Sequence, residues 1–162
     1  MMSSVVKVGM ADLKTVQSPG ILTTLGLGSC VGICLHDPIS KVAGMAHIML
    51  PSSKSIKNNK NIFKFADTGI DKLIDEMVKN GAKKRRMISK IAGGAQMFSF
   101  STKNDIMKIG ERNVIAVKKI LKEYGIPIKA EDTGGGHGRT IEFHSINGKL
   151  IVKTIGHGIK EF

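Results

Sequence analysis

The sequence predicts a mixed α/β fold: a single-domain layered sandwich of largely antiparallel β-strands with two long helices. Three observations indicate this class. About seven to nine short runs rich in Val, Ile, Thr and Phe alternate with turn signals, as strands do. Two longer segments, 67–80 and 109–124, carry apolar residues at helical spacing. The 162 residues contain no internal repeat and have the length of one domain, which we expect to cover residues 1–162.

The strand runs are separated by residues that favour tight turns. Gly26 and Gly28 permit a sharp bend, and Asp37 followed by Pro38 has the chemistry of a type I turn. Asn147 with the glycine that follows it is a strong hairpin signal. The expected strands cover residues 5–10, 21–25, 30–35, 42–50, 87–92, 126–132, 140–146 and 150–155.

Each helical segment carries one apolar stripe. In 67–80 the apolar residues recur at positions i, i+3, i+4, i+7 and i+8, and Gly81 is a stop signal. The segment 109–124 has a comparable stripe and ends before Gly125 and Pro127. The stripes consist of Ile70, Leu73, Ile74, Met77 and Val78 in the first segment and Val114, Val117, Ile120, Leu121 and Tyr124 in the second. Both helices are therefore expected to bury one face.

Composition excludes general disorder and indicates an anionic partner. Hydrophobic residues make up 41% and charged residues 23%, which is ordinary for a globular protein. The formal net charge of +12 favours nucleic acid, acidic lipid or an acidic protein surface. The densest basic run, 83–86, has no interleaved aromatic residues, so a solvated surface is favoured over single-stranded nucleic-acid binding. We expect no nucleic-acid partner.

The chain has the features of a reduced cytoplasmic protein. Its longest apolar stretch, 21–35, is broken by glycines and is shorter than the roughly 20 residues that a membrane span requires. No basic segment leads into an apolar run at the N-terminus, so neither a signal peptide nor membrane insertion is expected. On one strand, Cys30 and Cys34 would lie about 13 Å apart, which is too far for a disulfide.

The segment from Gly26 to Cys30 is a candidate nucleophile loop. Glycines directly before a cysteine allow a sharp bend that exposes backbone N–H groups, here around Gly28 and Ser29. Such groups can stabilise the oxyanion that forms when a carbonyl is attacked. A glycine turn followed by a buried structural cysteine is the alternative, and the spacing alone leaves both open.

A hairpin register argument places a histidine beside this cysteine. If the turn is centred between Pro38 and Ile39, Cys30 lies directly opposite His47 on the same sheet face, with Cβ atoms about 4.5–5.5 Å apart. An adjacent imidazole lowers the pKa of a thiol and yields the nucleophilic thiolate. A loop of three or five residues would turn the pair to opposite faces. A hydrogen-bonded core histidine is the alternative interpretation of His47.

Two other chemistries fit the sequence less well. Cys30, Cys34, His36 and His47 have the chemistry of zinc ligands, but on a strand the two cysteines are too far apart for two bonds of about 2.3 Å to one ion. The glycine-rich stretch 134–139 precedes a strand pattern rather than a helix, so we expect an inter-strand turn instead of a phosphate site.

The segment 97–100 has two possible roles. Its sequence, Met-Phe-Ser-Phe, follows two glycines and an alanine. It either exposes aromatic side chains to a partner or buries them in the core.

Motifs along the whole chain resemble one known family. The segments 24–31 and 46–51, which contain Cys30 and His47, resemble the CheD family of bacterial chemoreceptor glutamine deamidases. The resemblance continues through 65–68, 93–98, 109–114, 132–135, 138–139 and the hairpin at 147–148.

The resemblance implies a cysteine hydrolase with the layered α/β fold of cytotoxic necrotizing factor catalytic domains. Cys30 matches the family's nucleophile, His47 its base and Thr24 its third catalytic position. Thr24 is selected by the resemblance alone, since by spacing it is an ordinary strand threonine. The implied mechanism passes through a thioester and needs no metal or organic cofactor.

The resemblance also implies the partners. The implied substrates are glutamine side chains of methyl-accepting chemotaxis proteins, which become glutamates with release of ammonia. The implied regulatory partner is CheC, a phosphatase of the response regulator. The alternative function is a non-catalytic adaptor that binds receptors and CheC.

Overall fold

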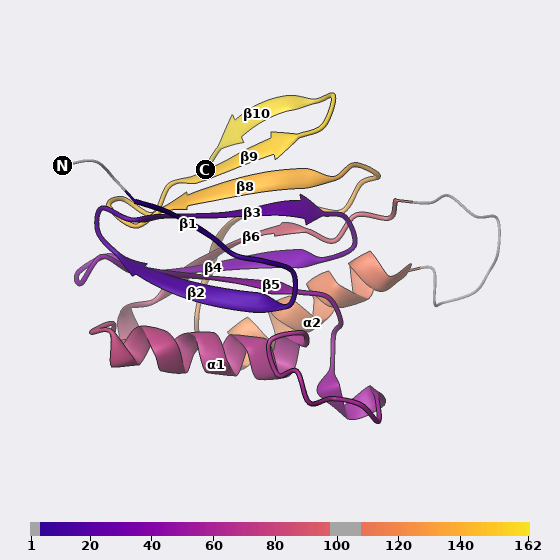
Figure 1. Ribbon diagram of the computed structural model, residues 1–162, viewed down its shortest axis with the longest axis horizontal. Helices are drawn as coiled ribbons and strands as arrows, with labels where there is room; N and C mark the ends of the chain where they lie inside the picture. The colour runs from indigo at the N-terminus through magenta and orange to yellow at the C-terminus, as the bar shows by residue number, and fades with distance from the viewer. Residues whose placement is uncertain (1–3, 98–107) are drawn as a thin grey trace.

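The computed structural model, which describes residues 4–97 and 108–162, has three layers (Figure 1). Two five-stranded sheets pack against each other, and two helices cover the free face of one sheet. The sheet that the helices cover is the middle layer, and we call it the central sheet. We call the other one the outer sheet. The expected mixed α/β sandwich with two long helices is confirmed.

The outer sheet has the strand order β1-β3-β8-β9-β10, and the central sheet has the order β2-β5-β4-β6-β7. Neighbouring strands are antiparallel except for the parallel pairs β1–β3 and β6–β7. The outer-sheet strands are β1 (Val5–Lys7), β3 (Ile21–Leu27), β8 (Arg139–His144), β9 (Leu150–Thr154) and β10 (Gly158–Glu161). The central-sheet strands are β2 (Asp12–Gln17), β4 (Val31–Asp37), β5 (Val42–Ile48), β6 (Ile88–Gly93) and β7 (Ile128–Thr133).

The helices are α1 (Ala66–Lys79) and α2 (Ile109–Glu123), with short 3₁₀ turns η1 (Ser53–Ser55) and η2 (Lys84–Arg86). In α1 the predicted stripe is buried except for Val78, which is 47% exposed because it lies at the margin of the packed face. In α2 the stripe also faces the core, with Val117 and Leu121 fully buried. No helix in the described residues combines the length and apolar character needed to cross a bilayer.

Two apolar layers result, one on each side of the central sheet. Val31, Ile33 and Leu35 of β4 pack with the helices, whereas Cys34 lies in the cluster between the two sheets. The alternation follows from strand geometry, in which successive side chains point to opposite faces. Because both faces are covered, every residue of β4 and β5 is buried.

Two strands, β2 and β10, were not predicted. Both lie at the edge of a sheet, where only one side of the strand is paired. All four residues of β10 are exposed, and only Leu13 of β2 is buried. A strand held mainly by backbone pairing carries little hydrophobic alternation, so the sequence pattern does not reveal it.

The predicted register of the β4–β5 hairpin is wrong by two residues. His47 lies opposite Gly32 rather than Cys30, because the loop has four residues between the paired Asp37 and Val42. The Asp37 carboxylate accepts hydrogen bonds from the N–H groups of Ile39 (2.9 Å) and Ser40 (3.3 Å), which lengthens the turn. A shift of two keeps every side chain on its predicted face.

Candidate active site

Thr24, Cys30 and His47 come from three separate segments, and their side chains lie in the layer between the two sheets. His47 lies on β5 between Ala46 and Ile48, which face the helices, so its ring points toward the outer sheet. Cys30 directly precedes β4 and belongs to the cluster between the sheets. It lies two residues before Gly32, the residue paired with His47, so it is on the same side of the central sheet as His47.

A hydrogen bond of 2.7 Å joins Thr24 Oγ1 to His47 Nδ1. The same hydroxyl donates to the carbonyl oxygen of Val8, also at 2.7 Å. A hydroxyl has one proton, so Thr24 must accept from an Nδ1–H group of His47. The lone pair is then on Nε2, which is buried and has no hydrogen-bond partner among the described residues. The ring is therefore held in the tautomer that can accept a proton at Nε2.

Burial disfavours the charged form of both candidate groups. Cys30 is 8% exposed, while Thr24 and His47 are each 1% exposed. Burial lowers the pKa of His47, and it raises the pKa of the Cys30 thiol against the opposing effect of that residue's own backbone N–H. The thiolate that a neighbouring imidazole would produce therefore stays a prediction, and burial of the thiol opposes it.

In the nucleophile loop, the carbonyl groups of residues 28–30 are all hydrogen-bonded. Gly28 O accepts from the N–H of Ala95 and Cys30 O from the N–H of Gly94, each at 2.8 Å. Ser29 O accepts from Asn113 Nδ2 at 2.9 Å. In a trans peptide the N–H points opposite to the C=O, so the N–H groups of Ser29 and Cys30 point away from these partners. The N–H of Gly28 is already used by Gly26 O (3.0 Å).

Sequence reasoning assigned no role to Asn113 or to the backbone of Gly94 and Ala95. A signal for Asn113 exists, because it falls four residues before Val117 and eight before Leu121 on the buried stripe of α2. A polar residue on such a stripe needs a specific partner. Which carbonyl groups it contacts follows only from the folded chain.

The other two residues with zinc-ligand chemistry, Cys34 and His36, do not form a metal site with Cys30 and His47. Cys34 is a buried free cysteine, as is Cys30. His36, near the far end of β4, hydrogen-bonds through Nε2 to the carbonyl oxygen of Ser145 at 2.7 Å. Within residues 4–97 and 108–162, no group of three or more His, Cys, Asp or Glu side chains is arranged to hold a metal ion.

The two remaining motifs lie outside the site. The glycine-rich stretch forms the expected turn between β7 and β8, with positive φ at Gly134 and Gly135. The basic run contains η2, and its last residue, Arg86, pairs with the buried Asp37 at the end of β4 remote from Cys30. Met97 is exposed, and residues 98–100 lie outside the described residues.

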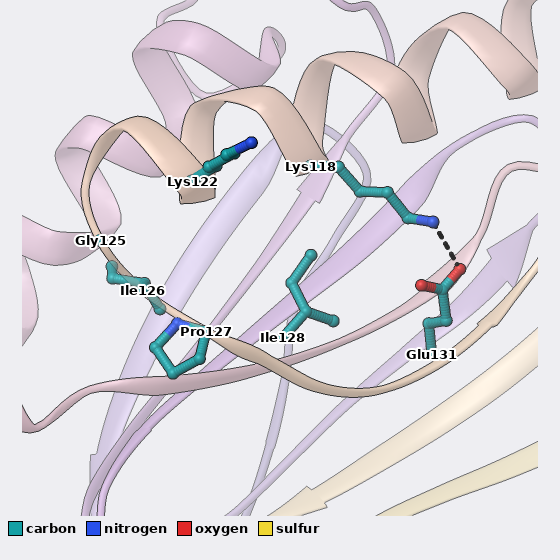
Figure 2. Close-up of a pocket in the computed structure, with 7 residues that line it drawn as sticks. All are labelled: Lys118, Lys122, Gly125, Ile126, Pro127, Ile128 and Glu131. Atoms are coloured by element: carbon teal, nitrogen blue, oxygen red, sulfur yellow. Dashed lines mark ion pairs between the residues drawn. The ribbon is translucent and has the colours of Figure 1, made fainter.

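At least three cavities border α2 within the described residues, and two of them also border β7. One of about 440 Å³ lies between α2 and the start of β7, and the ion pair Lys118–Glu131 (2.9 Å) borders it (Figure 2). The other, of about 330 Å³, is lined in part by Gly94, whose N–H holds the Cys30 carbonyl. None of the three candidate side chains lines either cavity, but the second is connected to the nucleophile loop through the backbone of Gly94.

Among solved structures, the chain resembles the Bacillus licheniformis protein YfiH. The two superpose with a TM-score of 0.47 at 15% sequence identity, over 75% of this chain and 50% of that chain.

Sequence comparison identifies much closer relatives. The family described as CheD chemotactic sensory transduction matches residues 49–154. A protein of Caldanaerobacter subterraneus subsp. tengcongensis, named "Probable chemoreceptor glutamine deamidase CheD", is 67% identical over 160 residues, covering 99% of both chains. The "Chemoreceptor glutamine deamidase CheD" of Halalkalibacterium halodurans is 55% identical over 161 residues, again covering 99% of both. On the strength of these matches, the chain belongs to the CheD family.

Proposed function

We propose that this protein is a protein-glutamine deamidase that converts glutamines of methyl-accepting chemotaxis receptors to glutamates. The observation that carries the proposal is the Thr24–His47 hydrogen bond, which leaves Nε2 of His47 as a proton acceptor in the layer that also holds Cys30. The names of the full-length relatives support the substrate class.

In the first half-reaction, His47 Nε2 takes the proton of Cys30 Sγ as the sulfur attacks the carboxamide carbon. The oxygen of the tetrahedral intermediate accepts hydrogen bonds from the N–H groups of Ser29 and Cys30, while Gly28 supports their backbone conformation. The protonated His47 then gives its proton to the departing nitrogen. The C–N bond breaks, ammonia leaves, and a thioester on Cys30 remains.

In the second half-reaction, His47 takes a proton from water, and the oxygen attacks the thioester carbon. The C–S bond breaks, the sulfur leaves with the electron pair, and His47 returns the proton to it. The product is a glutamate side chain. Through both halves Thr24 accepts from the Nδ1–H of His47 and so maintains its orientation, as the third member of a triad does.

The proposed setting is bacterial chemotaxis. We infer a cytoplasmic protein of one domain that acts on the cytoplasmic helices of the receptors and has CheC as its regulatory partner. The net charge of +12 suits an acidic receptor surface. Co-purification of CheC with the tagged protein tests the partner separately from the reaction.

The direct test incubates the protein with a receptor cytoplasmic fragment and follows the glutamine-to-glutamate mass change by peptide mass spectrometry. Wild type and Cys34→Ala should both convert specific glutamines, whereas Cys30→Ala should convert none. Conversion that persists in Cys30→Ala would exclude the proposed nucleophile. A receptor fragment that binds but is never converted would favour the adaptor function instead.

A further inference from the structure

We propose that Asn113 is a positioning residue that holds the nucleophile loop and the end of the histidine strand in one fixed arrangement. Its Nδ2 donates to Ser29 O at 2.9 Å and to Met49 O at 3.0 Å. Ser29 directly precedes Cys30, and Met49 lies two residues after His47. One side-chain amide of α2 therefore connects the segments that carry both reacting groups. The inference rests on the proposed roles of Cys30 and His47.

The orientation of this amide is unambiguous. Both partners are carbonyl oxygens, which only the NH₂ end of an asparagine can face. Asn113 is 0% exposed, and its Oδ1 has no hydrogen-bond partner among the described residues. An amide with an unsatisfied buried oxygen is costly in a helix core. Its presence indicates a specific requirement for the two hydrogen bonds that it does make.

The backbone of α2 also holds the nucleophile loop in place, in addition to the two hydrogen bonds of Asn113. A Cβ atom at Gly110 would collide with the carbonyl oxygens of Gly94 and Ala95, so the first turn of α2 approaches that segment at backbone contact. The N–H groups of Gly94 and Ala95 in turn hold the carbonyls of Cys30 and Gly28. The helix thus contacts the nucleophile loop indirectly through backbone and directly through Asn113.

The Ser29 carbonyl differs from its two neighbours, because a side chain rather than a backbone N–H holds it. It belongs to the same peptide unit as the N–H of Cys30, the proposed oxyanion donor. Without Asn113 that peptide unit can rotate, which turns the N–H away from the oxyanion. Loss of the Met49 contact would at the same time loosen the chain just beyond His47. Both effects act on the reaction rather than on receptor binding.

The test compares wild type with Asn113→Leu, which keeps the branched shape without a donor, and with Asn113→Asp, which has no donor while ionised. Deamidation of a receptor fragment is measured as kcat and KM, and alkylation of Cys30 by iodoacetamide is measured independently of any receptor. Ser145→Ala is the matched control, because it also removes a buried side-chain-to-backbone hydrogen bond (Ser145 Oγ to Gly20 O, 2.6 Å). Ser145 lies beyond the end of β8 that is remote from Thr24.

We expect kcat to fall about 10- to 100-fold in both Asn113 variants, with KM within about twofold of wild type. The rate of Cys30 alkylation should change as well. In Asn113→Asp, lowering the pH should restore part of kcat relative to wild type, because a protonated carboxyl regains one donor. Ser145→Ala should show a lower melting temperature but unchanged kcat and alkylation.

Unchanged kcat and alkylation in folded Asn113→Asp would overturn the proposal, even if Asn113→Leu does not fold. Equal losses in Ser145→Ala would overturn it too, since the effect would then be general destabilisation. If wild type deamidates no receptor fragment, the proposed function fails. The alkylation rates would still decide whether Asn113 positions Cys30.

Discussion

The buried polar groups at the two ends of strand β4 differ in whether they have hydrogen-bond partners. At the Asp37 end, the buried carboxylate accepts from the N–H groups of Ile39 and Ser40, from the N–H of Lys83 (2.9 Å) and from the Arg86 guanidinium (2.7 Å). At the Cys30 end, Nε2 of His47 and Oδ1 of Asn113 are buried without partners among the described residues.

The contrast separates a structural site from a chemical one. A fully satisfied buried charge stabilises the fold and is unreactive, because every lone pair is occupied. A buried imidazole with one nitrogen held and the other unpaired costs stability, but it leaves a basic lone pair available. Substitutions at the Asp37 end should therefore mainly lower stability, whereas substitutions at the Cys30 end should mainly lower activity.

His47→Ala should produce the largest loss of activity. We expect deamidation to fall about 10²- to 10⁴-fold, the usual contribution of a general base, as measured by initial rates of glutamine conversion. Since burial lowers the pKa of His47 below its ordinary 6.5, the wild-type rate should begin to fall only at pH values below 6.5. A variant within a few fold of wild type would remove His47 from the mechanism.

Asp37→Asn should produce the largest loss of stability. Asp37 is 0% exposed and its partner Arg86 only 25%, so removing the carboxylate leaves a half-buried cation without its counter-charge. We expect a loss of about 3 kcal/mol in the free energy of unfolding, measured by urea denaturation, with activity per folded molecule unchanged. A loss of activity without a loss of stability would reverse the proposed contrast.

The lowered pKa of Asp37 also predicts how the stability of the wild-type protein depends on pH. Burial alone would raise the pKa of Asp37, but hydrogen bonds from Arg86, Lys83 and Ile39 hold it well below its ordinary 3.8. Below pH 3.8 the unfolded chain therefore binds more protons than the folded one, and this part of the stability declines as pH falls. It is fully present above pH 3.8, and Asp37→Asn should lack this component of the acid dependence.

Thr24→Ala should have an intermediate effect on activity. Loss of one orienting hydrogen bond is expected to cost about 1–3 kcal/mol, or roughly 5- to 150-fold in rate, while Cys30 remains open to alkylation. In the His47→Ala background the same substitution should add nothing, because no ring remains to be oriented. A double variant slowed by the full additional factor would show that Thr24 acts independently of His47.

Charge reversal in the basic run should have the smallest effect. Lys83, Lys84 and Arg85 are exposed and lie at the Asp37 end, whereas Arg86 must be retained because it pairs with Asp37. Reversing the three to Glu should slow receptor association, most clearly at low salt, and leave kcat and Cys30 alkylation unchanged. Association rates that respond neither to the reversal nor to salt would assign the run to solubility alone.

Periodicity and turn chemistry in the sequence determined both helices, most strands and the faces that they bury. The predicted pairing of Cys30 with His47 is wrong by two residues, but the two-residue period of a strand still puts both on the same side of the central sheet. The edge strands β2 and β10 were not predictable, since backbone pairing rather than a hydrophobic pattern forms them.

Only the tertiary structure decided what surrounds that pair. Thr24 reaches His47 across two different sheets, and Asn113 reaches Ser29 over 84 positions of sequence. Nothing local to either residue encodes such a contact, because it depends on how closely the layers pack. The effect of burial is also a tertiary property: enclosure between the sheets lowers the pKa of His47 and raises that of the Cys30 thiol, which the spacing of the two residues does not reveal.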